Sequence, residues 1–337
     1  MLTRRQFLNS TIASAALTAL PFCSSGGSTK PNIPAIPFAH SKLGLHIVTY
    51  QVHLNPDGTL DKTYPTQETF ERSALFGKWA VAEFFMDRWN ASDVRPALVL
   101  QAEAAKRANL NYIIRLEDTR TYTIAGTTPI HLNDDWFFND WLSYVRAVVH
   151  LTSDYAYGYQ IGNEVWNVDW TMRGPGGGEL TAKEYVGWFR ATREEILKIA
   201  PQADVLMSGG TNIVQDRYWS KMLALIDAGI LELSNFNAHL YPRANLNGTE
   251  LARLRKFAEL VNAAKRSLFV TEVNTHDPGK SDSYKLGVLQ NVYANLSDLF
   301  DLRAFCVFLA NQSYGLSGWT VLGTELEEMV KAKTVKN

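Results

Sequence analysis

Cysteine, excess charge and long apolar runs are all scarce in this chain of 337 residues. Of its two cysteines, Cys306 falls in an apolar run typical of a core strand, where a free thiol behaves as a small hydrophobe, so we expect no structural disulfide with Cys23. The 33 basic and 34 acidic residues leave a formal net charge of −1, which argues against a nucleic-acid-binding protein and against a polybasic membrane patch. Beyond the N-terminus, no apolar stretch is long enough for a transmembrane helix.

Signatures of cofactor and metal binding are also missing. Residues 51–54, after the first apolar run, contain no glycine-rich phosphate turn of the kind that opens a dinucleotide-binding sheet. The glycine-rich residues 173–178 lack the lysine and the serine or threonine of a P-loop, so we interpret them as a flexible loop, a candidate lid over a cleft. The histidines are not spaced like zinc ligands. We therefore expect neither a cofactor nor a metal.

The N-terminus has the pattern of an export segment. Residues 3–8, Thr-Arg-Arg-Gln-Phe-Leu, resemble the twin-arginine signal, and the apolar residues 11–22 that follow are too few to span a bilayer. Cys23, followed by a Ser/Gly stretch, resembles a lipoprotein attachment site, although Pro21 and Phe22 stand where such sites have small residues. We expect an export signal over residues 1–28, a linker over 29–40 and one catalytic domain over 41–337. The alternative to an export signal is a chance Arg-Arg pair at an ordinary N-terminus.

Short apolar runs alternate with amphipathic segments through the rest of the chain. The expected strands are residues 43–48, 79–85, 112–116, 158–162, 204–208, 236–240, 268–272 and 304–309. The expected helices are residues 97–108, 135–151, 181–199, 217–228, 249–264, 282–299 and 324–332. Such alternation implies parallel strands with right-handed crossovers. Eight units of this kind predict an α/β fold, a closed (β/α)8 TIM barrel, rather than an open doubly wound sheet.

Two of the apolar runs end in a glutamate. Residues 159–163 lead to Glu164, and residues 268–271 lead to Glu272. A strand interior seldom carries a lone carboxylate, because burying an unpaired charge is costly. A glutamate at the C-terminal tip of a barrel strand faces the mouth of the barrel instead. Two such glutamates, about 5 Å apart and with different pKa values, form the carboxylate pair that cleaves glycosidic bonds with retention.

With these residues the sequence resembles the large clan of (β/α)8 retaining glycoside hydrolases, which includes cellulases, mannanases, xylanases and β-xylosidases. The matching positions are Asn163-Glu164 after the fourth expected strand, a His-x-Tyr element at His239 and Tyr241 after the sixth, and Glu272 ending the seventh. The resemblance implies that Glu164 is the acid/base and Glu272 the nucleophile. It also implies that Asn163 contacts the sugar 2-hydroxyl, that Tyr241 donates to Glu272, and that His239 helps to position substrate and nucleophile.

The chain departs from the clan at two places. Many members carry an arginine near the end of the second strand that contacts the nucleophile, and here Arg88 and Arg115, in the third strand, are the candidates. Many also place a tryptophan under the sugar at the end of the eighth strand, and here the nearest is Trp319. Sugar-binding clefts use flat aromatic faces, so Trp166, Trp170 and Trp319 are candidate platforms among nine tryptophans, most of which should pack in the core.

These patterns predict an exported, periplasmic or extracellular glycoside hydrolase of the retaining type, whose partner is a β-linked oligo- or polysaccharide. A transglycosylase, or a hydrolase tied to exopolysaccharide secretion, would use the same residues. A non-catalytic carbohydrate-binding barrel is a third hypothesis, against which the two glutamates weigh. Two local alternatives stay open: Glu164 could be a structural carboxylate paired with an arginine such as Arg115, and Glu117-Asp118 could line the cleft or cap the segment that follows.

Overall fold

The computed structural model of the chain describes residues 36–49, 51–54, 60–122, 129, 133, 135–167, 171–175, 177–210, 212–310 and 320–336. The expected export signal with Cys23, most of the expected linker, Trp170 and Trp319 lie outside these residues. Within the described ranges, no helix combines the length and the apolar character needed to cross a membrane.

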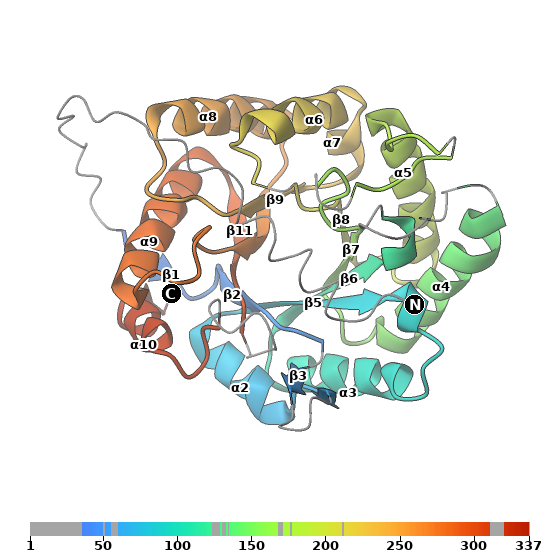
Figure 1. Cartoon of the computed structure of the whole chain (residues 1–337), viewed down its shortest axis with the longest axis horizontal. Coiled ribbons are helices and arrows are strands. Elements are labelled where there is room, and N and C mark those ends of the chain that lie inside the picture. The colour runs from blue at the N-terminus through green and yellow to red at the C-terminus, as the bar shows by residue number, and fades with distance from the viewer. Residues whose placement is uncertain are drawn as a thin grey trace.

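One eight-stranded sheet forms the centre of the molecule (Figure 1). Its strands, in the order β8-β7-β6-β5-β2-β11-β10-β9, all pair in parallel. A parallel bridge between Gly210 and Ala238 connects β8's outgoing segment to β9, so the sheet is nearly closed. The strand bounds are β2 Leu43–His46, β5 Trp79–Phe85, β6 Asn111–Glu117, β7 Gly158–Ile161, β8 Asp204–Leu206, β9 Phe236–Leu240, β10 Leu268–Val273 and β11 Leu302–Phe308. The predicted (β/α)8 barrel is thus confirmed.

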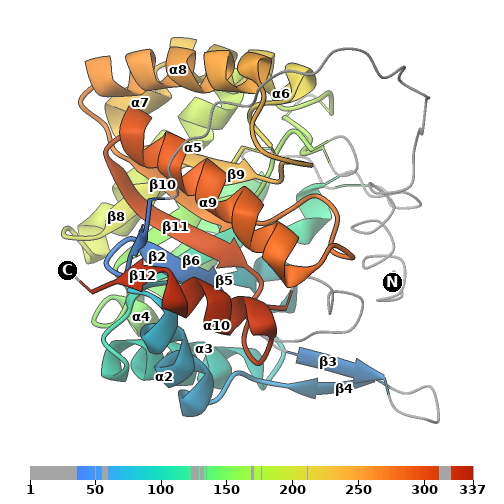
Figure 2. The same ribbon diagram turned by 90° about the vertical axis from the view of Figure 1, so that its left-hand side faces the viewer.

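Helices surround the sheet (Figures 1 and 2). They are α2 Gln67–Phe76, α3 Val94–Arg107, α4 Leu142–Thr152, α5 Ala182–Ile199, α6 Asp216–Asp227, α7 Ile230–Leu233, α8 Gly248–Ala263, α9 Asp282–Leu299 and α10 Glu325–Ala332, with the short turns η1 Met86–Arg88, η2 Thr119–Thr121 and η3 Trp136–Trp141. The remaining strands are β1 Phe38–Ala39, which pairs with β12 Thr334–Val335, and β3 Gln51–Leu54, which pairs with β4 Leu60–Thr63.

Three features differ from the sequence-based expectation. Helix α2 was not expected, because among its ten residues only Phe70, Ser73 and Phe76 are buried, which gives a sparse apolar stripe. The β3–β4 hairpin was also missed; it follows the C-terminal end of β2 and projects from the body of the molecule (Figure 2). The helix expected over residues 135–151 begins instead with the π-helical turn η3 before α4 starts.

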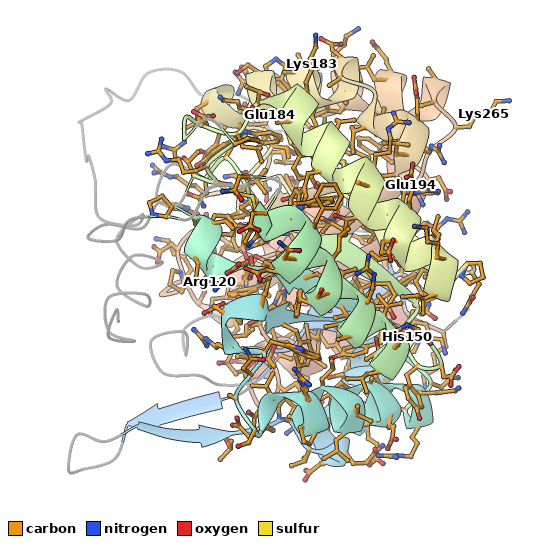
Figure 3. The ribbon with its side chains drawn as sticks, turned by 90° about the vertical axis from the view of Figure 1, so that its right-hand side faces the viewer. Arg120, His150, Lys183, Glu184, Glu194 and Lys265 are labelled. Atoms are coloured by element: carbon orange, nitrogen blue, oxygen red, sulfur yellow. The ribbon has the colours of Figure 1, made fainter. Side chains whose placement is uncertain are left out.

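The N-terminus of α5 agrees with its sequence signal. Thr181 accepts a hydrogen bond from the backbone N–H of Glu184, and the Glu184 side chain accepts from the backbone N–H of Thr181, which is the expected capping box. Figure 3 shows α5 from outside the barrel beside α4, with Lys183 and Glu184 in its first turn and Glu194 further along. The reciprocal hydrogen bonds satisfy donors that the helix itself leaves unpaired.

The barrel interior has an apolar lower layer and a polar upper layer. The lower layer consists of Trp79, Val81, Ile113, Leu206, Phe269, Ala304 and Cys306. In β5 and β6, every second side chain points into the barrel. The inward pair Val81–Ile113 is followed, two residues closer to the C-terminal ends, by the inward pair Glu83–Arg115. The strands therefore carry packing residues below and charged side chains at the mouth.

The close approach of β2 and β5 gives a test of this packing. A Cβ on Gly44 would lie 2.5 Å from both Cβ and O of Trp79, so Gly44→Ala should overpack the barrel wall. We expect the free energy of unfolding, measured by denaturant titration, to fall by about 1–3 kcal/mol. The control is Gly287→Ala on the exposed side of α9, where a Cβ meets nothing within 4 Å and where alanine should stabilise the helix by about 0.5–1 kcal/mol. Equal changes in the two variants would contradict the predicted contact.

Candidate active site

Two carboxylates and one imidazole meet at the C-terminal ends of the strands. Glu164 follows β7, His239 lies in β9 and Glu272 lies in β10, and one donor atom from each is within 4.8 Å of the other two. Glu164 and Glu272 are each 6% exposed and His239 is fully buried. In β10 the register shifts between Val270 and Glu272, and this bulge lets the consecutive residues Thr271 and Glu272 both reach His239.

Glu272 is surrounded by donors and cations. The Arg115 guanidinium donates to Oε1, the Tyr241 hydroxyl donates to Oε2 at 2.8 Å, and His46 Nδ1 lies 3.4 Å from Oε1. Burial raises the pKa of Glu272, but the charges of His239, Arg115 and His46 and the Tyr241 hydrogen bond outweigh burial and lower this pKa to about 2. Glu272 is therefore an ionised carboxylate at neutral pH.

Glu164 has a different environment, made of an amide and an imidazole. Its Oε2 accepts a hydrogen bond from Asn167 Nδ2 at 2.8 Å, and its Oε1 lies 2.9 Å from His239 Nδ1. Its backbone has φ +43°, in the left-handed region, and is held there by its N–H donating to Gly209 O and by its carbonyl accepting from the Asn167 N–H. No guanidinium touches this carboxylate within the described residues.

Of the two candidate arginines, Arg115 is the one at the site. Its NH1 donates to Glu272 and also to Asn163 Oδ1 at 3.1 Å. The Arg88 guanidinium lies instead over the Phe85 ring, 5.0 Å from its centroid. Arg115 is not the partner of Glu164, because Arg115 binds Glu272 and His239 faces Glu164.

Sequence reasoning missed one charged residue of the same cluster, Glu83. Glu83 Oε2 lies 2.7 Å from His46 Nε2 and 3.8 Å from Arg115 NH2. Burial raises the pKa of Glu83, but the charge and hydrogen bond of His46 and the charge of Arg115 lower it further than burial raises it. The sequence could have revealed Glu83, since it is a lone carboxylate inside an apolar strand. The same pattern singled out Glu272.

The aromatic residue at the end of β11 is Phe308. Its ring centroid lies 5.2 Å from that of His46 and 6.1 Å from that of Tyr241, the two rings that flank Glu272. Phe308 therefore lies beside the nucleophile candidate, whereas Trp319, the tryptophan named from the sequence, is outside the described residues. Phenylalanine at this place was missed because the expectation was for tryptophan.

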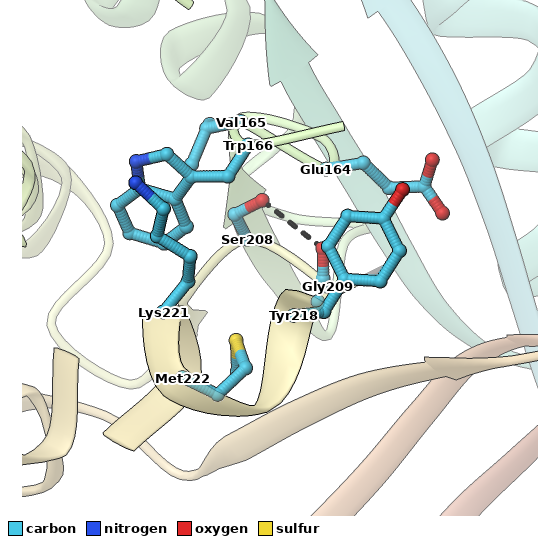
Figure 4. Close-up of a pocket in the computed structure, with 9 residues that line it drawn as sticks. Glu164, Val165, Trp166, Ser208, Gly209, Tyr218, Lys221 and Met222 are labelled. Carbon is cyan, nitrogen blue, oxygen red and sulfur yellow. Dashed lines mark hydrogen bonds between the residues drawn. The ribbon is translucent and has the colours of Figure 1, made fainter. Parts of the chain in front are cut away.

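Trp166 lies on the Glu164 side of the site. Its Nε1 donates to Leu180 O at 2.6 Å, and its ring packs on Tyr185, with the centroids 5.6 Å apart. Only 9% of its surface is exposed. A pocket beside it also receives side chains from the chain after β8 and from α6 (Figure 4); it is lined by Glu164, Val165, Trp166, Ser208, Gly209, Gly210, Tyr218, Lys221 and Met222.

The two carboxylates at the end of β6 have separate roles. Asp118 is fully buried and caps the turn η2, accepting from Arg120 N and from Trp136 Nε1. Glu117 joins the charged cluster instead, with Oε1 3.7 Å from Arg115 NH2. Burial and the nearby charges of Glu83, Glu272 and Asp87 raise the pKa of Glu117 to about 8, although the charge of Arg115 opposes them. Glu117 is therefore protonated at neutral pH.

Glu164, His239 and Glu272 are also the one set of three donors in the described ranges whose atoms converge closely enough for a metal ion. Both Glu272 oxygens already accept hydrogen bonds, from Arg115 and Tyr241, and a guanidinium next to the site repels a cation. We assign no metal to this cluster.

The glycine-rich loop expected over residues 173–178 is described except for residue 176, and its ends are joined by a bridge between Arg173 and Glu179.

Glu117 makes a testable contribution to the pH dependence of stability. Its pKa is about 8 in the folded protein against 4.5 as the ordinary value, so the unfolded chain releases this proton first as the pH rises. The free energy of unfolding should therefore fall between about pH 4.5 and 8, by up to about 1.4 kcal/mol per pH unit from this group. Glu117→Gln should lack this fall, so the difference between the two denaturant-derived curves should grow with pH. Parallel curves would contradict the assignment.

The chain matches no family model and no curated protein, but solved structures share its fold. An endo-β-1,4-glucanase from Xanthomonas axonopodis pv. citri, a triple mutant, has a TM-score of 0.61 at 18% identity, covering 87% of this chain and 98% of that chain. A GH30 endoxylanase from Clostridium papyrosolvens has a TM-score of 0.55 at 12% identity, covering 88% and 72%. A GH5_18 variant from Streptomyces cattleya in complex with Manβ1-4GlcNAc has a TM-score of 0.55 at 14% identity, covering 88% and 77%. At these identities, the likeness shows that the chain shares the (β/α)8 fold of these proteins.

Proposed function

We propose that the chain is a glycoside hydrolase of the retaining type. The observation that carries the proposal is the pair Glu164 and Glu272, whose nearest described donor atoms lie within 4.8 Å across the barrel mouth. Retaining glycosidases hold their carboxyl groups about 5–5.5 Å apart, whereas inverting enzymes need about 6.5–9.5 Å to admit a water. The different surroundings of the two glutamates support different roles, because one is held ionised by cations and the other is not.

The roles follow from these surroundings. Glu272 attacks the anomeric carbon while Glu164 gives a proton to the leaving oxygen, and a glycosyl-enzyme forms. Water then attacks the same carbon, Glu164 takes its proton, and the bond to Glu272 breaks. Arg115 fixes Glu272 and also holds Asn163 Oδ1, so that the Asn163 amide N–H groups are available for the sugar 2-hydroxyl.

The surrounding residues support a sugar substrate. Phe308 supplies an apolar face beside Glu272, next to His46 and Tyr241. A small pocket lined by Trp166 adjoins Glu164. Structural neighbours described as a β-1,4-glucanase and as a complex with Manβ1-4GlcNAc support a β-linked oligo- or polysaccharide as the substrate class.

We also propose that the protein is exported to the periplasm or the cell exterior. The support is the N-terminal sequence, with Arg4-Arg5 before an apolar run and Cys23 as a candidate lipid-attachment site. A lipid at Cys23 would hold the enzyme at a membrane surface without a spanning helix.

The carboxylate pair can be tested with aryl β-glycosides and β-glucans. Wild-type protein should cleave at least one member of the panel, and Glu272→Ala should lose activity by at least about a thousandfold, because the bond-forming group is gone. Glu259→Gln on the exposed surface of α8 is the matched carboxylate control and should leave the rate unchanged. Product NMR should show the β-anomer first, and an α-anomer would overturn the retaining mechanism.

Glu164→Ala separates the second role in the same assay. This variant should slow the hydrolysis of substrates with poor leaving groups most. Added azide should restore turnover of an activated aryl glycoside and give a β-glycosyl azide as the product. Added sugar acceptors distinguish hydrolysis from transglycosylation by their products. Binding of a glycan by wild-type protein without any cleavage would favour a non-catalytic barrel.

Tyr241→Phe gives a prediction for the pH profile. Loss of the hydroxyl that donates to Glu272 Oε2 should raise the pKa of Glu272, because one of the groups that stabilise its ionised form is gone. The acid limb of kcat/KM, which reports protonation of the nucleophile, should therefore move to higher pH. At neutral pH kcat/KM should fall about tenfold to a hundredfold. Tyr155→Phe, at the opposite end of the barrel, should change neither quantity; an unshifted acid limb in Tyr241→Phe would refute the assigned contact.

A further inference from the structure

A chain of buried hydrogen bonds leads from the barrel wall to His239. Asn237 Nδ2 donates to the backbone carbonyl of Met207 at 3.0 Å, and Thr271 Oγ1 donates to Asn237 Oδ1 at 3.0 Å. His239 Nε2 lies 3.1 Å from the same Thr271 oxygen. The side chains of Asn237, Thr271 and His239 have no exposed surface, so water does not compete for these contacts.

The Met207 carbonyl, at the start of this row of hydrogen bonds, determines the donor and the acceptor in each of the others. A backbone carbonyl can only accept, so the Asn237 amide nitrogen must face Met207 O and the amide oxygen must face Thr271. The amide oxygen can only accept, so the single Thr271 hydroxyl hydrogen points to Asn237. The Thr271 oxygen is left to accept, and His239 Nε2 must therefore carry a hydrogen.

The other nitrogen of the ring faces Glu164. With a hydrogen fixed on Nε2, a neutral His239 presents the Nδ1 lone pair to Glu164 Oε1 at 2.9 Å, and this contact is a hydrogen bond only if one further proton lies between the two atoms. That proton is either on Glu164, with a neutral imidazole, or on Nδ1, with an ionised Glu164. In both cases Glu164 and His239 share one proton.

The ring is held by packing as well as by hydrogen bonds. A Cβ on Gly209 would lie 2.1 Å from His239 Nε2, so only glycine lets the ring take this place, and the carbonyl of the same glycine accepts from the Glu164 N–H. The charged groups that face the ring are Glu164 after β7 and Glu272 in β10, with Oε2 of the latter 3.5 Å from Nδ1. Arg115 in β6 and Tyr241 after β9 neutralise or bind Glu272 in turn.

We propose that Thr271 and Asn237 are positioning residues that lock His239 in the Nε2–H form and so make Glu164 and His239 share the proton used to cleave the glycosidic bond. This inference rests on the proposed hydrolase function. Thr271 and Asn237 touch neither substrate nor the reacting atoms in this account, and act through His239.

This fixed Nε2–H form of His239, the tautomer lock, affects Glu164 both as an acid and as a base. When Glu164 gives its proton to the leaving oxygen, the C–O bond breaks and Glu272 bonds to the anomeric carbon. The ionised Glu164 then faces the Nδ1 lone pair at 2.9 Å, a repulsive contact that makes the carboxylate a stronger base. It regains a proton from the incoming water, whose oxygen bonds to the anomeric carbon as the bond to Glu272 breaks, and the shared proton is restored.

Kinetics of two matched variants test the proposal. Thr271→Val keeps the shape of the side chain without the acceptor for Nε2–H, so the Nδ1–H form, which leaves Glu164 without its acid proton, becomes accessible. We expect kcat/KM to fall about tenfold to a hundredfold for substrates with poor leaving groups and less than about threefold for 2,4-dinitrophenyl glycosides, which need no acid. Thr271→Ser keeps the hydroxyl and should restore wild-type rates. Equal losses on both substrate types in Thr271→Val would indicate a structural role and overturn the proposal.

A second measurement does not depend on activity. Protein labelled with ¹⁵N-histidine reports the tautomer of each ring, and the His239 signals are assigned by their loss in His239→Gln. The proposal requires an Nε2–H signal for His239 in wild type and in Thr271→Ser, with a shift toward Nδ1–H in Thr271→Val. A wild-type ring with hydrogen on Nδ1 alone overturns the lock even if the enzyme is active. The expected tautomer in a protein that cleaves no glycoside would leave the lock intact and refute the hydrolase function instead.

Discussion

The charged interaction between Arg115 and the carboxylates around it is the constraint on which the barrel mouth depends. One buried guanidinium lies within 4 Å of Glu83, Glu117 and Glu272. Burying a carboxylate without a partner is costly, and removing one member of a buried ion pair leaves the others uncompensated. His46 also contacts two of these carboxylates, since it lies between Glu83 and Glu272. Glu117 keeps its proton and so adds no further negative charge.

This arrangement is possible because parallel strands place packing and chemistry on the same inward face. Trp79 and Val81 fill the lower barrel from β5, and Glu83 follows with the same phase at the mouth. The apolar layer excludes water from below, so charges above it interact through a medium of low polarity, where hydrogen bonds and ion pairs are stronger. The bulge in β10 then adds a second functional residue, because Thr271 and Glu272 both reach His239.

The two glutamates have the same side chain but different partners at the barrel mouth. Glu272 is bound by a guanidinium and a phenol, which stabilise its charge. Glu164 is bound by an amide and by an imidazole whose other nitrogen is already committed to Thr271. The difference comes from contacts across the barrel rather than between neighbouring strands. Arg115 of β6 reaches Glu272 on β10, and His239 of β9 reaches Glu164 after β7.

The barrel could be predicted from the sequence, since the strands are short apolar runs and amphipathic segments follow nearly all of them, and local signals such as the Thr181–Glu184 capping box were sufficient to start a helix. The two site glutamates could also be found from the sequence, because a lone carboxylate in or next to an apolar run stands out; in the structure Glu164 follows β7 and Glu272 is the penultimate residue of β10. Helix α2 was missed because its apolar stripe is sparse, and Glu83 was missed although it is a lone carboxylate in an apolar strand. The tertiary structure was needed to show that Arg115 rather than Arg88 binds Glu272, that Phe308 lies beside the site, and that His239 Nε2 faces Thr271 Oγ1. These contacts depend on distances across the nearly closed barrel, which are set by strand register and by a bulge, and no local pattern of residues encodes them.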